Sequence, residues 1–195
     1  YVGLGGGAMP TFTRHALPAA QIDVVEIDPV IIAVARTFFG FSPDYRMAVH
    51  AADGRAFIEA APAGYYDLIV LDAFAEDAVP FALATQEFLA SVRSRLAPNG
   101  VAVANLWTAA PDYEGMLATW DATFEYVALL RVPRRRQRIL VAAANRPLTR
   151  DALAHHADAL ADRIALGFDL PALVRRGYEG PPDPHAAVLR DADRR

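Results

Sequence analysis

The chain has 195 residues, 54% hydrophobic and 22% charged, which predicts one sizeable core, and its net charge of −4 argues against nonspecific nucleic-acid binding. It contains neither cysteine nor lysine, which excludes disulfides, thiolate metal sites, cysteine nucleophiles and Schiff-base or P-loop lysines. No apolar run reaches the roughly 18 residues of a membrane span and nothing resembles a signal peptide, so we expect a cytoplasmic protein without a membrane partner.

Strands and helices alternate along the chain. The opening residues read as the end of a strand, and the chain begins with Tyr1 instead of Met, so we expect a truncated first strand and a preceding N-terminal portion. Further strands are predicted at 21–28, 46–51, 66–71, 101–106, 126–132 and 138–144, and helices at 9–17, 29–39, 55–60, 86–96 and 113–122. The last two strands are joined by a short turn with Arg134, Arg135 and Arg136, which we interpret as a solvated tip.

This alternation predicts an α/β fold. We expect a doubly wound, mostly parallel seven-stranded sheet with helices on both faces and a terminal antiparallel hairpin. Residues 1–147 would form this Rossmann-like domain. Residues 148–195 would form a helical C-terminal appendage that ends in a flexible tail, because the segment around 177–184 is rich in Pro and Gly.

Candidate binding residues follow the first four predicted strands. The first is followed by Gly5, Gly6 and Gly7, which let backbone N–H groups approach a ligand. The next three are followed by Glu26, Asp53 and Asp72. Each acid alone is more readily interpreted as a helix N-cap, but the carboxyl ends of parallel strands meet at one edge, where α/β sheets bind ligands. There Glu26 could hold both ribose hydroxyls of a nucleoside, Asp53 its adenine amino group and Asp72 an amine-bearing end.

Two cofactors fit this pattern. The run from Gly3 to Ala8 also satisfies a loose dinucleotide fingerprint, and Glu26 lies near the distance expected for the ribose acid of an NAD site. However, the third strand ends in Asp53-Gly54, and the predicted sheet ends in a hairpin instead of a second mononucleotide-binding half. An S-adenosylmethionine-type nucleoside therefore fits better than NAD.

At these residues the sequence resembles the spermidine synthase-like branch of the class I S-adenosylmethionine-dependent transferases. The resemblance covers residues 2–107 through Gly-Leu-Gly-Gly-Gly at 3–7, Val-Glu-Ile-Asp-Pro at 25–29, Ala-Asp-Gly at 52–54, Tyr-Asp-Leu-Ile-Val-Leu-Asp at 66–72 and Thr-Gln-Glu-Phe at 85–88. It implies a class I methyltransferase fold and S-adenosylmethionine or its decarboxylated form as co-substrate. It also implies that Glu26 holds the ribose, Asp53 and its neighbour Gly54 the adenine, and Asp72 the aminopropyl or methionyl end.

Three positions depart from the family pattern. Ala8 stands where aminopropyltransferases usually carry an aspartate that grips the amino group of decarboxylated S-adenosylmethionine. Ala75 stands where they carry the aspartate that accepts a proton from the attacking amine, and Asn105 replaces a glutamine near the polyamine. In the loop around Ala75, Glu76 and Asp77 are candidate replacement bases, or else solvated loop acids. An alanine at position 8 also removes repulsion against the carboxylate of intact S-adenosylmethionine, so we expect that nucleoside to be accepted.

The resemblance thus implies a transferase of polyamine biosynthesis that moves an aminopropyl group to an amine. Ala8 and Ala75 instead favour methyl transfer from S-adenosylmethionine to a small molecule, and a catalytically silent nucleoside-binding module is the third interpretation. The expected partner is a small-molecule amine or other small acceptor, not nucleic acid, and a homodimer is a further expectation because family members often dimerise. The histidines lack metal-ligand spacing, so no metal is expected.

Overall fold

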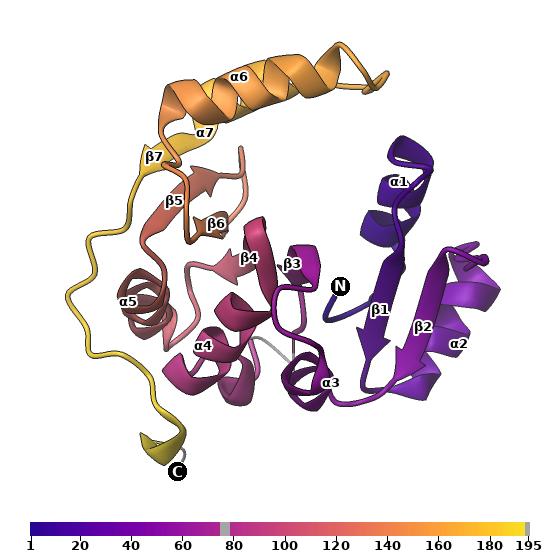
Figure 1. Ribbon diagram of the computed structural model, residues 1–195, viewed down its shortest axis with the longest axis horizontal. Helices are drawn as coiled ribbons and strands as arrows, with labels where there is room; N and C mark the ends of the chain where they lie inside the picture. Colours follow the sequence, from indigo (N-terminus) through magenta and orange to yellow (C-terminus); the bar gives the residue numbers. More distant parts are fainter. Residues whose placement is uncertain (75–78, 194–195) are drawn as a thin grey trace.

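The computed structural model describes residues 1–74 and 79–193 (Figure 1). Its helices are α1 (Ala8–Ala16), α2 (Pro29–Phe38), α3 (Gly54–Ala60), α4 (Gln86–Arg95), α5 (Tyr113–Thr123), α6 (Arg150–Ala161) and α7 (Leu170–Gly177). Its strands are β1 (Ile22–Glu26), β2 (Met47–Ala51), β3 (Tyr66–Leu71), β4 (Leu96–Trp107), β5 (Tyr126–Arg131), β6 (Gln137–Ala143) and β7 (Tyr178–Gly180). Two short 3-10 helices are η1 (Phe81–Leu83) and η2 (Asp191–Asp193).

The strands form two hydrogen-bonded sets. β1 and β2 pair in parallel, and the other strands follow the order β3-β4-β6-β5-β7. In this second set β3 runs parallel to β4, whereas β6 runs antiparallel to both β4 and β5. The expected seven-stranded, mostly parallel sheet is therefore corrected to a mixed set of five strands and a separate parallel pair. The terminal antiparallel hairpin is confirmed as β5 and β6.

The opening residues lie between the two sets. Val2 forms one parallel bridge to Val25 of β1 and another to Leu71 of β3. The Val2 N–H donates to the Val70 carbonyl at 2.8 Å, and the Asp72 N–H donates to the Val2 carbonyl at 2.9 Å. This pairing is too short to count as a strand, because the chain enters the glycine turn directly after Val2. The segment nevertheless aligns the carboxyl ends of β1 and β3 at one edge.

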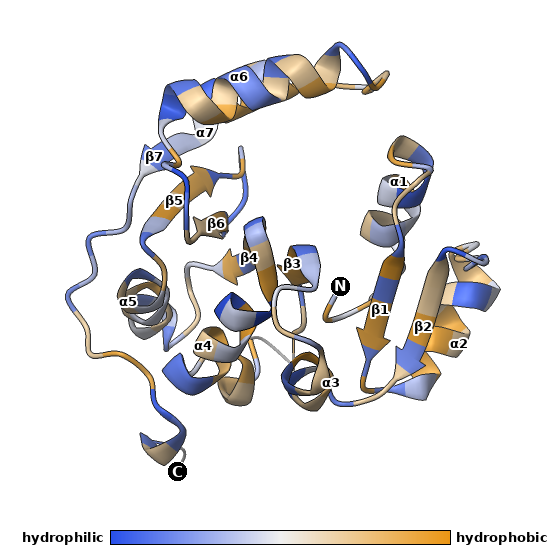
Figure 2. Ribbon diagram, viewed as in Figure 1, coloured by the Kyte–Doolittle hydropathy of each residue, from blue (hydrophilic) through white to orange (hydrophobic). Residues whose placement is uncertain are grey.

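Helices cover both faces of the strands. On one face, α3, α4 and α5 pack over the main core, whose largest fully buried side chains include Trp120 of α5 and Phe88 of α4. Trp120 stacks on Phe124 with ring centroids 5.2 Å apart. On the other face, α2 packs over β1 and β2 through Ile32 and Ala35. In Figure 2, β1 and β5 are largely hydrophobic, whereas the short edge strand β7 is hydrophilic.

Polar side chains cap the N-termini of α2 and α4. The Asp28 carboxylate accepts a hydrogen bond from the Val30 N–H at 2.8 Å and caps α2, which Pro29 then enters at its first position. Thr85 caps α4 in the same way, through the Phe88 N–H at 3.4 Å. The α2 helix therefore begins directly after β1, whereas α4 begins at Gln86, well after β3 ends at Leu71.

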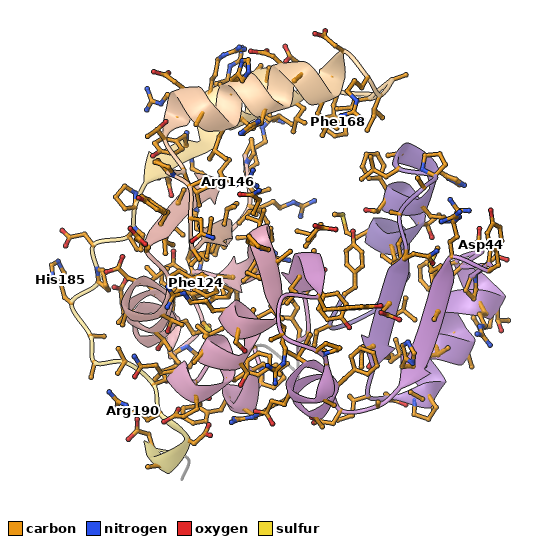
Figure 3. All side chains as sticks on the ribbon, viewed as in Figure 1. Asp44, Phe124, Arg146, Phe168, His185 and Arg190 are labelled. Atoms are coloured by element: carbon orange, nitrogen blue, oxygen red, sulfur yellow. The ribbon has the colours of Figure 1, made fainter. Side chains whose placement is uncertain are left out.

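The C-terminal residues extend the fold past β6. α6 and α7 pack together beside β5, and β7 adds an antiparallel edge to that strand. Arg146 lies between α6 and the sheet (Figure 3). The segment expected to be a flexible tail then runs back across α5 and α4: the Leu189 N–H donates to Thr119 Oγ1 at 2.9 Å, and the Gln86 N–H donates to the Leu189 carbonyl at 2.8 Å. None of the helices described here is both long and apolar enough to cross a membrane.

Candidate functional site

The glycine turn after Val2 has a shape that its glycines require. At Gly3 the backbone is left-handed, with φ +97°, and a Cβ there would lie 2.4 Å from the Asp72 carbonyl oxygen. At the other end, Gly7 has φ +77° and forms the N-cap of α1, and its N–H donates to the Leu4 carbonyl at 2.9 Å. The turn thus brings β3 and the N-terminus of α1 close together.

Glu26 fixes this turn from the end of β1. One carboxylate oxygen, Oε2, accepts the Leu4 N–H, and the other, Oε1, accepts the Asp28 N–H, both at 3.0 Å. The sequence did not predict this bracing role. Each carboxylate oxygen has two acceptor sites, so one site on each oxygen is still available for a ribose hydroxyl.

Asp53 caps a helix and also lines the candidate binding cavity, the two roles that the sequence left open. Its Oδ1 accepts the Ala56 N–H at 2.8 Å and caps α3, and the residue also lines the cavity described below. The neighbouring Gly54 has a packing reason of its own, because a Cβ there would lie 2.4 Å from Val2 Cγ1. The close contact of α3 with the opening segment therefore depends on glycine at this position.

Asp72 follows β3 and is held by a side chain from β4. The Asn105 Nδ2 amide donates to Asp72 Oδ1 at 3.0 Å, which orients the carboxylate. The other polar atom of that amide, Asn105 Oδ1, is buried and has no hydrogen-bond partner among the described residues. The role of Asn105 in the structure is therefore to position the Asp72 carboxylate.

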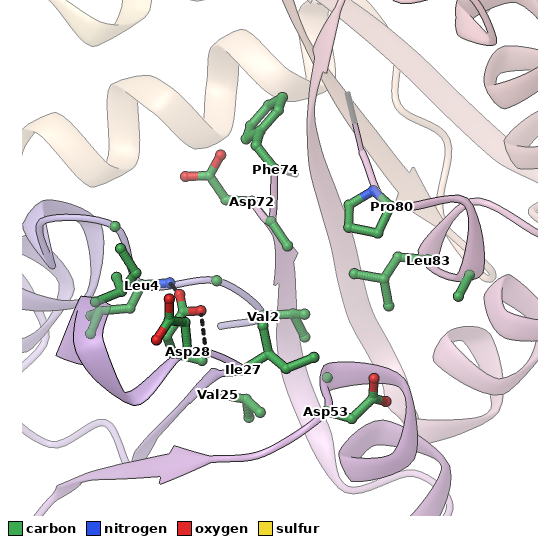
Figure 4. Close-up of a pocket in the computed structure, with 17 residues that line it drawn as sticks. Val2, Leu4, Val25, Ile27, Asp28, Asp53, Asp72, Phe74, Pro80 and Leu83 are labelled. Atoms are coloured by element: carbon green, nitrogen blue, oxygen red, sulfur yellow. Dashed lines mark hydrogen bonds between the residues drawn. The ribbon is translucent and has the colours of Figure 1, made fainter. Parts of the chain in front are cut away.

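A cavity of about 470 Å³ joins these groups at the carboxyl edge of the sheet (Figure 4). Gly5, Glu26, Asp53, Gly54 and Asp72 all line it. Asp72 and Asp53 lie at opposite ends of the view in Figure 4, with Val2 and Ile27 between them. Gly6 and Gly7 are not among the lining residues. The predicted bases Glu76 and Asp77, and Ala75, lie outside the described residues.

The walls of the cavity include residues that the sequence did not indicate. Ile27, Ile31, Phe74, Pro80 and Leu83 supply its apolar surfaces. Ile27 directly follows Glu26 and is 68% exposed in the folded chain. The sequence does not show this exposure, because an isoleucine next to a strand is ordinarily expected to be buried. An apolar slot flanked by carboxylates is suited to a flat, partly polar ring system.

Charge distinguishes the ligands that this cavity favours. Among the described residues that line it, Glu26, Asp28, Asp53 and Asp72 are acidic and none is basic. Carboxylates attract a cationic ligand and repel a pyrophosphate, so the arrangement fits a sulfonium nucleoside better than a dinucleotide. Within residues 1–74 and 79–193, no three His, Asp or Glu side chains are grouped to hold a metal ion.

Comparisons with known proteins identify the same branch of transferases. A family model described as the spermine/spermidine synthase domain matches residues 3–129. A polyamine aminopropyltransferase of Vibrio vulnificus is 33% identical over 166 residues, which are 84% of this chain and 56% of that protein. The human eEF1A lysine and N-terminal methyltransferase is 42% identical over 116 residues, 54% of this chain and 17% of that protein. The chain thus spans only about half, or less, of the length of these relatives.

A solved structure shows the same fold. Human methyltransferase-like protein 13, in complex with SAH, superposes with a TM-score of 0.73 at 34% identity, over 86% of this chain and 81% of that one. The fold is therefore that of Rossmann-like methyltransferases. Since the family model covers more than half of the residues, the chain belongs to the spermine/spermidine synthase family.

Proposed function

We propose that this chain binds an S-adenosylmethionine-type nucleoside in the cavity at the carboxyl edge of the sheet and transfers a group from it to an amine. The observation that carries the proposal is the meeting of Glu26, Asp53 and Asp72, from three separate strand ends, around one cavity without a described basic residue. In this proposal Glu26 holds the ribose, Asp53 accepts from the adenine amino group, and Asp72 faces the aliphatic end.

The N-terminus of α1 favours intact S-adenosylmethionine as the co-substrate. Gly7 supplies no side-chain cap, Ala8 is exposed, and the first turn contains no acidic residue. The unpaired N–H groups and the positive end of the helix dipole at that place favour an anion, such as the carboxylate of a methionyl group. The relative solved with SAH supports this choice, and methyl transfer is then the reaction.

Aminopropyl transfer is the second candidate. It is favoured by the family model and by the aminopropyltransferase relative, which matches 84% of this chain. In either reaction the bound nucleoside would supply a carbon made electrophilic by its neighbouring sulfonium. The attacking amine must be neutral, so a carboxylate has to accept its proton. Asp72 is the described candidate, and the roles of Glu76 and Asp77 as bases stay predictions.

Calorimetry with both nucleosides tests the choice of co-substrate. We expect the chain to bind intact S-adenosylmethionine at least as tightly as the decarboxylated form. Ala8→Asp should weaken the binding of intact S-adenosylmethionine by about tenfold, because it places a second negative charge beside the methionyl carboxylate. Ala33→Asp, which adds the same charge on the exposed side of α2, should leave both affinities unchanged.

Product analysis separates the reactions. S-adenosylhomocysteine would mark methyl transfer, and methylthioadenosine would mark aminopropyl transfer. Tight binding of either nucleoside with no product from any amine would favour the silent binding module. If neither nucleoside binds, the proposed function is wrong.

A further inference from the structure

An arginine-rich hairpin lies at the same edge of the sheet as the cavity. Residues 131–138 include five arginines and no acid. Trp107 at the end of β4 is paired with Gln137, and Arg131 at the end of β5 is paired with Arg138, so the hairpin turn follows the carboxyl ends of these strands. β3 ends at the same edge, because Leu71 is paired with Ala104 in a parallel ladder.

The hairpin and the end of α7 enclose a second cavity, of about 290 Å³, which we call the arginine pocket. It is lined by Arg131, Pro133, Arg134, Leu173, Arg176 and Gly177. One acid lies beside the pocket: Glu179 pairs with Arg138 at 2.5 Å and lies 3.9 Å from Arg131. Arg134 and Arg176 are exposed and form no ion pair with another described residue. Two guanidinium groups therefore remain available to an anion.

Arg134 is held in a strained conformation. Its φ is +61°, and it is the one residue other than glycine with a positive φ among residues 1–74 and 79–193. The turn is closed by the Arg135 N–H, which donates to the Val132 carbonyl at 3.2 Å, so Arg134 occupies the position where such turns favour glycine after proline. Strain of this kind is typical of ligand-binding positions, and here it presents a guanidinium to the pocket.

We propose that the arginine pocket binds a glutamate or aspartate side chain of a polypeptide acceptor whose amine reaches Asp72. This proposal rests on the proposed function, which it deepens by naming the acceptor class. A pocket of this volume suits a side chain more than a complete ligand: Leu173 and Pro133 would contact the aliphatic stem, and the arginines would contact the carboxylate.

The spacing between the two cavities supports a polypeptide. β3 and β5 are separated by β4 and β6, so three strand spacings, or about 14 Å, are the least distance between the two places. The register makes Leu71 level with Leu129, and the hairpin extends further than that level. A small amine could not contact both places, whereas about four to six residues of extended chain would span them. A polyamine would be repelled by the arginines, and the net charge of −4 argues against nucleic acid.

Fluorescence anisotropy with a labelled peptide tests the proposal. The probe carries one lysine and a pair of glutamates about four to six residues away, and a second peptide replaces the glutamates by glutamine. We expect saturable binding of the acidic peptide that weakens with salt, and little binding of the glutamine peptide. The double variant Arg134→Gly with Arg176→Gln should bind about tenfold more weakly, the scale of two or three exposed charge contacts.

The variants separate binding from folding. Arg134→Gly relieves the strained backbone while it removes the guanidinium, so it should unfold at no lower urea concentration than the wild type. The matched control is Arg36→Gln with Arg93→Gln, which removes the same charge from exposed positions on α2 and α4 and should keep full peptide affinity. In transfer assays the pocket variant should raise KM for the acidic peptide and leave kcat unchanged.

Three results would overturn the proposal. The first is an equal loss of peptide affinity in the pocket variant and in the control variant. The second is unchanged peptide affinity in the pocket variant. The third is displacement of the labelled peptide by a single-stranded oligonucleotide at a lower concentration than by unlabelled peptide. Nucleoside binding by calorimetry is measured separately on the same variants. Peptide binding without nucleoside binding would contradict the proposed function, whereas nucleoside binding without peptide binding would contradict only the arginine pocket.

Discussion

Two glycines of the opening turn are constrained in different ways. A Cβ on Gly3 would overlap the Asp72 carbonyl, whereas a Cβ on Gly5 would meet no heavy atom within 4 Å. Both glycines line the cavity. The first glycine therefore serves the contact between the turn and β3, and the open side of the second is available to a ligand.

Alanine at each position should separate stability from binding. Gly3→Ala adds backbone overlap to left-handed strain, so we expect the free energy of unfolding to fall by about 3 kcal/mol or more. Gly5→Ala should lower it by only about 1 kcal/mol, from strain alone, yet weaken nucleoside binding. Urea unfolding and calorimetry with S-adenosylmethionine measure the two effects. Equal destabilisation by both substitutions would contradict this division of roles.

The sequence revealed the acids of the cavity but not all of their contacts. Glu26 and Asp72 could be predicted because Glu26 lies at the end of an apolar strand and Asp72 directly follows another. That Glu26 accepts the Leu4 and Asp28 N–H groups depends on how the turn folds back on β1, which no spacing in the sequence records. The apolar wall at Leu83 comes from a 3-10 helix without a recognisable motif.

At the scale of elements, one arginine joins three segments around the cavity. Arg55, the second residue of α3, donates from Nη1 to the Ala82 carbonyl at 3.2 Å and to Thr85 Oγ1 at 3.3 Å. Its guanidinium also donates to both carboxylate oxygens of Asp191 in η2, at 2.7 and 2.6 Å. The C-terminal segment thus supports η1, whose Ala82 and Leu83 line the cavity.

Asp191→Asn tests this support. Loss of the charge should loosen Arg55 and η1, so we expect faster hydrogen exchange at Leu83 and Ala84 and nucleoside affinity reduced a few-fold. Because Asp191 lies at the surface and Arg55 is only half-buried, the free energy of unfolding should change by only about 1 kcal/mol. Asp158→Asn is the control, since it also removes one carboxylate charge from an ion pair, with Arg175 between α6 and α7, away from the cavity. Identical exchange in both variants would refute the support role.

Elements with clear periodicity were predicted well, and those made by tertiary pairing were not. β3 spans the predicted residues 66–71, and α5 differs from its prediction by one residue at its end. β7 escaped prediction because three residues carry no periodic pattern and its pairing with β5 depends on α7. The longer β4 begins before the Pro98-Asn99-Gly100 turn signal, which the sequence alone placed outside the strand.

At the scale of the whole molecule, the opening segment joins the two sets of strands. The sequence predicted the order of strands and helices and the terminal hairpin, but a continuous seven-stranded sheet required more pairing than Val2 provides. The division at residues 147 and 148 stays a prediction. β7 pairs with β5, and Leu189 and Asp191 contact α5 and α3, so many bonds cross that boundary.

Tyr66 and Asp23 lie on either side of the opening segment, and the ionisation of Tyr66 makes the free energy of unfolding of the chain depend on pH. Burial raises the pKa of Tyr66 to about 12, with a further contribution from the negative charge of Asp23. Below pH 10, the ordinary pKa of tyrosine, Tyr66 is protonated in the folded and unfolded chain, and its contribution to stability is fully present. Between pH 10 and 12 the unfolded chain releases this proton more readily, so the free energy of unfolding falls as pH rises.

Tyr66→Phe should remove part of this alkaline loss of stability. The remaining loss would come from Tyr1 and Tyr113, whose pKa values burial also raises. Urea unfolding midpoints measured from neutral pH to pH 12 provide the comparison, with ultraviolet absorbance following phenolate formation in the folded chain. Tyr45→Phe is the control. Because Tyr45 is 85% exposed, this substitution should give the same pH profile of stability as the wild type. If Tyr66→Phe instead retains the full fall between pH 10 and 12, ionisation of Tyr66 does not weaken the junction between the two sets of strands.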